Sequence, residues 1–225
     1  MKTKKILFVV TSHGKLGDTG KTTGYFLSEV THPWSVLSTK YDIDVVSPLG
    51  GKPPVDGFDL TDPINDKFWN DPLWQKKMSM TMTPDQVDPD LYDAIFYAGG
   101  HGAMWDFPDN KGLAEIAAKI YESGGYVSAV CHGPAGLLNI KLNDGSLLIK
   151  ERNITSFTNQ EEILNGTQNI VPFMLQSALT EKGADFHADK PWSDHVVVDG
   201  RVVTGQNPMS ALSLGKKLLE LLDNK

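Results

Sequence analysis

The sequence predicts an α/β fold in which a parallel β-sheet is sandwiched by helices. The main observation is a recurring unit, in which a short apolar run is followed by a Gly-rich turn and then by a helical pattern. The length of 225 residues is ordinary for a sheet protein of this class, and we expect one domain over residues 1–225. A composition of 40% hydrophobic and 22% charged residues excludes global disorder.

The individual elements follow from these patterns in chain order. Apolar runs predict strands at Lys5–Val10, Ile43–Ser47, Ala94–Ala98, Tyr126–Val130 and Ile154–Ser156. Helical periodicity predicts helices at Thr22–Val30, Asn110–Ser123, Gly133–Leu138, Val171–Lys182 and Pro208–Leu222. Asn207 is a suitable N-cap for the last of these helices. In Val196–Val203 an Asp-Gly pair separates two apolar runs, which predicts a late β-hairpin.

The segment from Gly50 to Asp90 departs from this rhythm, because it contains six prolines together with Trp69 and Trp74. It is too aromatic for a disordered linker, so we expect an ordered insertion that forms a cap or a subunit contact. A long surface loop without a role is the alternative that these residues leave open.

Charge and cysteine content narrow the functional classes. The formal net charge of -7 argues against nucleic acid or an anionic membrane as the main partner, since both select a concentrated basic face. The single cysteine, Cys131, excludes an intrachain disulfide and is typical of a reducing compartment. The apolar run that follows the basic residues at the start is too short for a signal peptide, and no stretch is long enough to span a membrane. We therefore expect a cytoplasmic protein.

Unusual residues follow three of the predicted strands. They are Thr11–Gly14, Gly99–Gly102 and Cys131–Pro134. Because the carboxyl ends of parallel strands meet at one edge of an open sheet, we expect these three loops to line one crevice.

The loop at Cys131 has the pattern of a nucleophile elbow. A strand, a polar residue and a helix follow one another, with small residues around the thiol. The positive end of the helix dipole should lower the pKa of the thiol. A buried structural cysteine is the alternative, but it would not need the His, Gly and Pro that follow here. We therefore interpret Cys131 as a catalytic nucleophile.

Two motifs, Ala129–Pro134 and Ala98–Gly102, resemble those of the ThiJ/PfpI superfamily, which has a flavodoxin-like, class I glutamine amidotransferase-like fold. The resemblance extends along essentially the whole chain. Three further stretches are similar to the heat-shock chaperone and glyoxalase III branch, which has a longer insertion after the second strand. These stretches are Glu29–Trp34, Ser156–Glu162 and Val203–Pro208.

The resemblance implies a triad and one further acid. The branch uses a Cys, the His that follows it and an acidic residue one strand later, which match Cys131, His132 and Glu162. A separate glutamate on the first helix, near the thiol, matches Glu29. The family spacing selects Glu162, whereas periodicity alone does not distinguish it from the adjacent Glu161.

The residues themselves leave the environment of Glu29 open. Tyr25, Phe26, Glu29 and Val30 share one face of the predicted first helix. Because Pro33 disfavours helix at the residue before it, Glu29 is expected near the helix end. The carboxyl is therefore either desolvated among aromatic side chains, with a raised pKa, or solvated at a helix terminus.

His132 is adjacent to the thiol, and adjacent residues on a regular helix do not face each other. A Cys131–His132 pair therefore requires the irregular backbone of an elbow, with Glu162 as the acceptor that orients the imidazole. By analogy with elbow enzymes, the N–H groups of Gly100 and His132 are candidates for an oxyanion hole. His101 is expected either to bind substrate or to cap a turn.

Other chemistries have less support. The histidines lack His-Glu-x-x-His spacing, although His13 and His32 could still meet in space, and we expect no metal. Gly17–Thr22 lacks the spacing of a phosphate-binding P-loop. A true glutamine amidotransferase pairs its cysteine with a late His-x-Glu, which is missing around His195.

The resemblance and these residues together imply a glutathione-independent glyoxalase (glyoxalase III, a D-lactate dehydratase and lyase) that converts methylglyoxal to lactate without a cofactor and protects against stress. One alternative is a stress chaperone or redox sensor without turnover, which would bind unfolded proteins. The other is a cysteine peptidase, amidase or deglycase on the same Cys-His-Glu site. We expect a small dicarbonyl as partner, rather than nucleic acid or a membrane, and a homodimer as the assembly.

Overall fold

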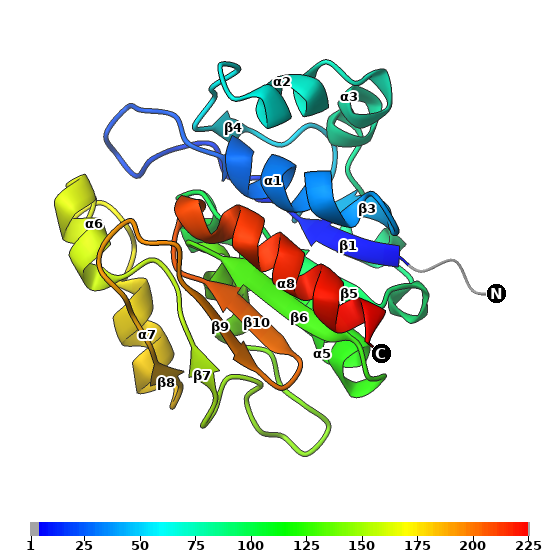
Figure 1. Ribbon diagram of the computed structural model, residues 1–225. Helices are drawn as coiled ribbons and strands as arrows, with labels where there is room; N and C mark the ends of the chain where they lie inside the picture. The colour runs from blue at the N-terminus through cyan, green and yellow to red at the C-terminus, as the bar shows by residue number, and fades with distance from the viewer. Residues whose placement is uncertain (1–4, 225) are drawn as a thin grey trace.

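The computed structural model describes residues 5–224, which form an α/β sandwich around a six-stranded sheet (Figure 1). The strands are β1 (Lys5–Val9), β3 (Asp42–Val46), β5 (Ala94–Tyr97), β6 (Tyr126–Val130), β9 (Val196–Asp199) and β10 (Val202–Gly205). Their order is β3-β1-β5-β6-β10-β9, and every neighbouring pair is parallel except β10–β9. The five parallel strands have the order of a flavodoxin-like fold, so the predicted fold class is confirmed.

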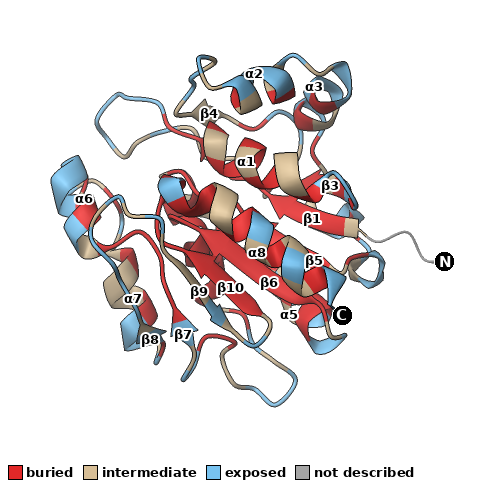
Figure 2. Cartoon of the chain, viewed as in Figure 1, coloured by how far each residue is buried: buried red, intermediate tan, exposed pale blue. Residues whose placement is uncertain are grey.

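Helices cover both faces of the sheet. The helices around the sheet are α1 (Leu27–Leu37), α4 (Ala103–Asp106), α5 (Lys111–Glu122), α7 (Leu175–Glu181) and α8 (Ala211–Asp223), and α6 (Asn159–Asn165) packs on α7. α1 and α8 pack together on one face, and α5 covers the other (Figure 1). Along β1, Ile6 and Phe8 pack in the core that includes α1 and α8, whereas Leu7 and Val9 pack in the core that includes α5. This alternation is the two-residue period of a strand that is buried on both faces. Figure 2 shows the central strands as almost continuously buried.

The first predicted helix differs from the structure at both ends. Tyr25–Phe26 forms a short strand, β2, that pairs with β4 (Val55–Asp56), so α1 begins only at Leu27. α1 then continues through Pro33, which lacks only the N–H that would bond to the carbonyl of Glu29. Glu29 therefore lies in the first turn of α1 and not near its C-terminal end, and it does not share a helix face with Tyr25 or Phe26.

The predicted strand at Ile154–Ser156 is also different, because the central sheet does not include it. Only β7 (Asn153–Ile154) is extended, and it pairs with β8 (Asp185–Phe186) in a separate two-stranded sheet. The chain then crosses the carboxyl edge of the main sheet, where the N–H of Phe157 donates to the carbonyl of Cys131 at 2.8 Å. This crossing brings the following residues to the predicted site.

Two helices are shorter than predicted, and the late hairpin is confirmed. The residues after Cys131 form a 3-10 turn, η3 (Gly133–Leu137), and the helix expected from Val171 begins at Leu175. Strands β9 and β10 form the hairpin, with Gly200 at φ +56° in its turn. Asn207 accepts a hydrogen bond from the N–H of Met209 and precedes a 3-10 turn, η4 (Pro208–Ser210), that leads into α8.

The segment from Gly50 to Asp90 is ordered and packs on α1. It contains β4, α2 (Pro63–Trp69), α3 (Pro72–Ser79), η1 (Pro84–Gln86) and η2 (Pro89–Leu91). The helices α2 and α3 each begin with a proline that follows a capping aspartate, which accounts for two of the six prolines. Trp34 of α1 packs edge-on against Phe68 and Trp74, with ring centroids 5.1 and 5.8 Å away. The segment's role as a cap or a subunit contact stays a prediction.

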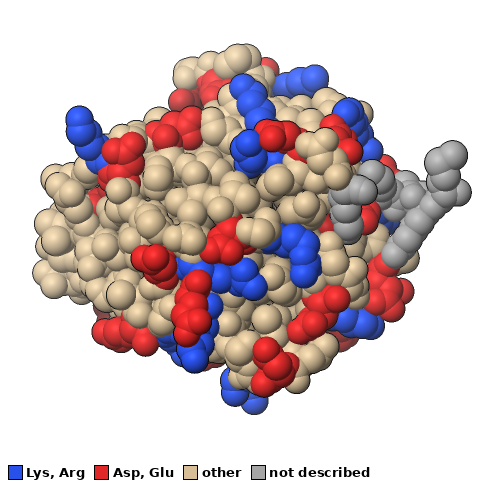
Figure 3. Space-filling view, turned by 60° about the horizontal axis from the view of Figure 1, so that its bottom comes forward, with Lys and Arg blue, Asp and Glu red and all other residues tan. Residues whose placement is uncertain are grey.

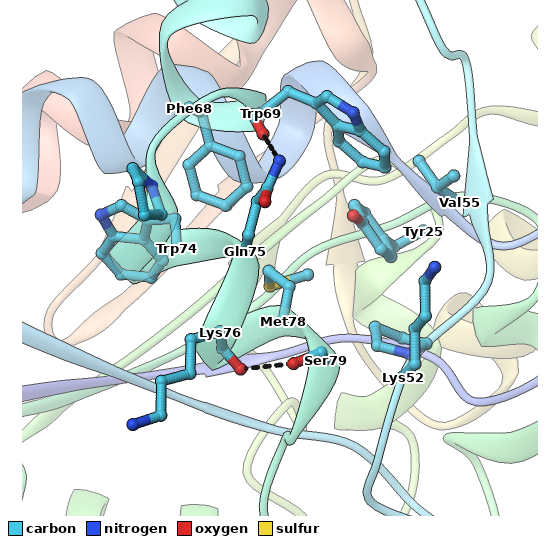
Figure 4. A pocket seen from close by; sticks show the side chains of 12 residues that line it. Tyr25, Lys52, Val55, Phe68, Trp69, Trp74, Gln75, Lys76, Met78 and Ser79 are labelled. Atoms are coloured by element: carbon cyan, nitrogen blue, oxygen red, sulfur yellow. Dashed lines mark hydrogen bonds between the residues drawn. The ribbon is translucent and has the colours of Figure 1, made fainter.

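The same segment and β2 line an open pocket of about 590 Å³ between β2, β4, α2 and α3 (Figure 4). Aromatic and aliphatic side chains form most of its wall, including Tyr25, Val55 and Trp69. The pocket does not include Cys131, so it is separate from the crevice that the sequence predicts.

Within residues 5–224, no helix is long and apolar enough to cross a bilayer. On the face shown in Figure 3, acidic and basic side chains are interspersed. The basic residues before Lys5, which entered the signal-peptide comparison, lie outside the described residues.

Candidate active site

Cys131 lies at a sharp turn that directly follows β6. Its φ of +59° is in the left-handed region, which is strained for a residue with a side chain. Its N–H donates to the carbonyl of Gly205 at 3.0 Å, so the sheet ladder holds the strained residue in place. A Cβ atom at Gly133 would lie 2.2 Å from the carbonyl oxygen of Tyr97, which explains the glycine in the motif. The backbone thus has the elbow geometry that the sequence predicts.

This irregular backbone lets His132 turn back toward the thiol. The Sγ atom of Cys131 lies 3.3 Å from Nδ1 of His132, and Nε2 of His132 lies 2.8 Å from Oε2 of Glu162. All three side chains are buried. The structure therefore brings together the three residues of the predicted triad. Cys131 and His132 face each other although they are adjacent, because the backbone at the elbow is not helical.

Glu162 is held as a carboxylate. Burial alone would raise its pKa, but hydrogen bonds from His101, His132 and Thr167 outweigh burial and hold the pKa well below its ordinary value. Burial and the neighbouring His101 lower the pKa of His132, whereas Glu162 opposes them. A neutral imidazole that faces a thiol on one side and a carboxylate on the other is suited to accept a proton.

His101 has a contact that the sequence did not suggest. Its Nε2 lies 3.0 Å from Oε1 of Glu162, and its ring centroid is 4.2 Å from that of His132. Each oxygen of Glu162 therefore faces one imidazole. A signal for this contact was present in the sequence, because a histidine follows each of the strands β5 and β6 within a few residues. These two strands are neighbours in the sheet, so the two histidines lie side by side at its carboxyl edge.

Glu29 also contacts the thiol, from the first turn of α1. Its Oε2 accepts a hydrogen bond from the N–H of Gly99 at 2.8 Å, and the side chain is completely buried. Burial raises the pKa of Glu29 to about 8, although its contacts with Cys131 and Gly99 oppose the rise. Of the two alternatives for this carboxyl, the structure shows the desolvated one. Its second oxygen, Oε1, is buried without a hydrogen-bond partner among the described residues.

The expected low pKa of the thiol is wrong. Burial raises the pKa of Cys131 well above its ordinary value, and the charge of Glu29 raises it further. The helix that was expected to lower it is only the five-residue turn η3. A backbone hydrogen bond from Gly100 acts in the opposite direction. The Glu29 carboxylate therefore disfavours ionisation of Cys131, whereas the protonated thiol favours ionisation of Glu29, and the two groups titrate as a coupled pair.

Gly100 directs its N–H at the thiol because its backbone has a φ of +97°. A Cβ atom there would lie 2.2 Å from the carbonyl oxygen of Gly24, so the turn fits against the chain that leads into β2 only with glycine. The N–H of His132 belongs to the elbow itself. The two predicted oxyanion donors thus flank the thiol from neighbouring loops, whereas His13 stacks on Trp105 and His32 pairs with Asp62.

The sequence did not reveal the role of Glu161. Its Oε1 accepts hydrogen bonds from the N–H of Trp192 and the side-chain amides of Gln206 and Asn207, and its Oε2 accepts from Thr158. The Thr158-x-x-Glu161 capping box at the start of α6 was the signal for this structural role. The adjacent Glu162 is left to face the histidines.

A second missed feature is an aromatic wall beside the triad. The ring of Phe157 packs 4.4 Å from His132, and Trp192 packs 5.5 Å from Phe157. Trp192 has a φ of +65° and is partly exposed, so the wall runs from the surface to the imidazole.

A buried cysteine on an elbow in a flavodoxin-like sheet, with acids on both sides, defines a class of protein. Residues 22–221 match the model of the DJ-1/PfpI family, and the chain belongs to this family. This finding confirms the predicted superfamily.

Several relatives match along nearly the whole chain. The chain is 35% identical to the glutathione-independent glyoxalase HSP31 of Saccharomyces cerevisiae, with 100% of both chains covered. Among solved structures, Rapid Encystment Protein 24 kDa of Francisella tularensis matches with a TM-score of 0.94 and 39% identity, covering 97% of this chain and 99% of that one. Glyoxalase III of Candida albicans matches with a TM-score of 0.90 and 32% identity, covering 97% of each chain.

Proposed function

We propose that the protein is a glutathione-independent glyoxalase that converts methylglyoxal to lactate, with Cys131 as its nucleophile. The observation that carries the proposal is the placement of the thiol between two acids of opposite character. On one side, His132 and the ionised Glu162 are suited to take up the thiol proton. On the other, Glu29 has a pKa raised to about 8, so it is largely protonated at neutral pH, and it contacts the thiol. The full-length similarity to named glyoxalases supports the same activity.

The first step forms a hemithioacetal. The thiol proton of Cys131 passes to Nδ1 of His132, and the sulfur attacks the aldehyde carbon, whose π electrons move to oxygen. Glu29 donates its proton to that oxygen, and the N–H groups of Gly100 and His132 stabilise the developing charge. His101, which shares the carboxylate of Glu162 with His132, is assigned to bind the substrate.

The second step moves a hydrogen between the two carbons. The Glu29 carboxylate removes the proton from the former aldehyde carbon, and the protonated His132 returns its proton to the ketone oxygen, which gives an enediol. Glu29 then protonates the second carbon and receives the hydroxyl proton of the first, which leaves a thioester. Hydrolysis by one water, with His132 as the base, releases lactate and restores the thiol. The first carbon is oxidised and the second reduced, so no external electron acceptor is needed.

The test is turnover of methylglyoxal by the purified protein in the absence of glutathione, followed by detection of lactate. We expect Cys131→Ala to abolish lactate formation, with at least a 10³-fold loss, since removal of a nucleophile eliminates the covalent route. Peptide and amide substrates are assayed in parallel. Turnover of these substrates without lactate formation would favour the peptidase alternative over the glyoxalase.

The remaining expectations are proposals of the same kind. A small dicarbonyl is the proposed substrate, and the stress-protective role, the homodimer and the cytoplasmic location remain predictions. The redox-sensor alternative is weakened by burial of Cys131, because oxidation of a cysteine favours an exposed thiolate.

A further inference from the structure

The side chains of His101, His132 and Glu162 converge from three separate elements. His101 follows β5, His132 follows β6, and Glu162 is on α6. One nitrogen of each imidazole and one oxygen of the carboxylate all lie within 4.8 Å of one another. Both imidazoles direct Nε2 at the carboxylate, at 3.0 and 2.8 Å. Few movements are needed to place all three atoms around one ion.

We propose that His101, His132 and Glu162 form a site for Zn²⁺, and that the ion inhibits the protein reversibly. Two imidazole nitrogens and one carboxylate oxygen are a ligand set that Zn²⁺ accepts, with water in the fourth position. Mg²⁺ and Ca²⁺ prefer sets made of oxygen atoms, so they should not compete. The ion reaches the site past His101, whose side chain is 16% exposed, whereas that of Glu162 is 2% exposed.

Inhibition follows from the two nitrogens of His132. In the structure Nδ1 of His132 faces Cys131 and Nε2 faces Glu162, and an uncharged imidazole has a proton on one ring nitrogen and a lone pair on the other. Zn²⁺ requires the lone pair of Nε2, and the single ring proton must then lie on Nδ1. His132 keeps its charge and its proton count, but Nδ1–H can no longer accept the thiol proton. This step rests on the proposed function, whereas binding of the ion does not.

The binding test uses the full chain, stripped with a chelator and titrated with Zn²⁺ in competition with a chromophoric chelator. We expect the wild-type chain to bind one Zn²⁺ per chain and to bind no Mg²⁺ at this site. His101→Ala should weaken Zn²⁺ binding by about 100-fold or more, since loss of even an outer-shell partner costs about 10–100-fold. His187→Ala is the matched control, because Nε2 of His187 lies 3.7 Å from a single carboxylate, that of Asp185, on the surface.

A third variant distinguishes this site from a thiolate site. Cys131→Ser should still bind Zn²⁺ with an affinity within a few-fold of wild type. The inference is overturned if Cys131→Ser loses the ion while His101→Ala retains it, or if His101→Ala and His187→Ala bind equally well. With methylglyoxal, stoichiometric Zn²⁺ should abolish turnover and EDTA should restore it. If the protein binds one Zn²⁺ that depends on His101 but has no glyoxalase turnover, only the proposed function is refuted. If turnover is complete while Zn²⁺ is bound, the proposed inhibition is refuted.

Discussion

Glu29 on α1 and Glu162 on α6 are both buried near Cys131, Glu29 in contact with the thiol and Glu162 in contact with His132 beside it. Their pKa values are nevertheless shifted in opposite directions. Glu29 accepts one backbone hydrogen bond and keeps a raised pKa of about 8. Glu162 is in contact with two imidazoles and a hydroxyl, which hold its pKa well below its ordinary value. Burial raises the pKa of both carboxyls, and the number of donors that reach each one decides whether burial is outweighed. One residue type thus supplies both a proton donor and a fixed negative charge around a single thiol.

The largest expected effect is on the Glu29 side of this comparison. Glu29→Gln keeps a hydrogen-bond donor but cannot carry a proton between two carbons, so we expect turnover of methylglyoxal to fall by at least about 10²-fold. Cys131 should still react with iodoacetamide, because the thiol and His132 are unchanged. Glu115→Gln, on the exposed face of α5, is the control. Near wild-type turnover in Glu29→Gln would assign the proton transfer to His132 instead.

The Glu162 side should respond almost as strongly. Glu162→Gln removes the charge that stabilises an imidazolium, and we expect about a 10²-fold loss of turnover. Glu161→Gln is the matched variant, since it makes the same change one residue earlier, in the network that holds Trp192 and the capping box. It should lower the free energy of unfolding by about 1.5–3 kcal/mol and leave turnover within ten-fold. If the two variants exchange these effects, Glu161 is the residue that supports catalysis.

The opposite pKa shifts also predict how stability depends on pH. The pKa of Glu29 rises from an ordinary 4.5 to about 8 on folding, so between these values the folded protein binds a proton that the unfolded chain does not. The contribution of Glu29 to stability is therefore present below about pH 4.5 and is lost as the pH rises through 8. Glu29→Gln should be more stable than wild type at pH 8 by about 3–5 kcal/mol, and the difference should vanish near pH 4. Urea unfolding at both pH values measures it, and a difference independent of pH would contradict the raised pKa.

The sequence predicted the sheet, the elbow and the meeting of the Gly99–Gly102 and Cys131–Pro134 loops, because these depend on local patterns. The recurring apolar runs indicate buried parallel strands, and the small residues around Cys131 indicate a strained turn. The pairing of His132 with Glu162 came from the family resemblance. The capping box of Thr158 and Glu161 would have given the same answer from the residues alone, since it assigns Glu161 to the helix start.

The errors arose where distant segments decide the local structure. Tyr25 and Phe26 have a helical pattern with Glu29, but they form β2 because they pair with Val55 and Asp56, some 30 residues away. The thiol was expected to have a low pKa from its helix dipole, whereas its burial between α1 and the elbow dominates. Neither packing nor desolvation is visible in a local sequence window, so these features required the structure.

The smallest expected effect concerns the hydroxyl of Thr167, a hydrogen-bond donor that reaches Glu162. Thr167 donates a hydrogen bond to Oε1 of Glu162, and Thr167→Val removes that donor while keeping the shape of the side chain. With one donor lost, the pKa of Glu162 should rise toward its ordinary value. A carboxylate with a depressed pKa stabilises the fold above its unfolded pKa, and this contribution is lost as the pH falls through the folded pKa, so the acid unfolding midpoint of Thr167→Val should move to higher pH. At neutral pH we expect a loss of about 1–2 kcal/mol of stability and less than a ten-fold loss of turnover, because both imidazoles still contact Glu162. Thr180→Val, whose hydroxyl is exposed, is the control. An unchanged acid midpoint in Thr167→Val would mean that His101 and His132 alone hold the charge, and the contrast with Glu29 would then depend on the two histidines.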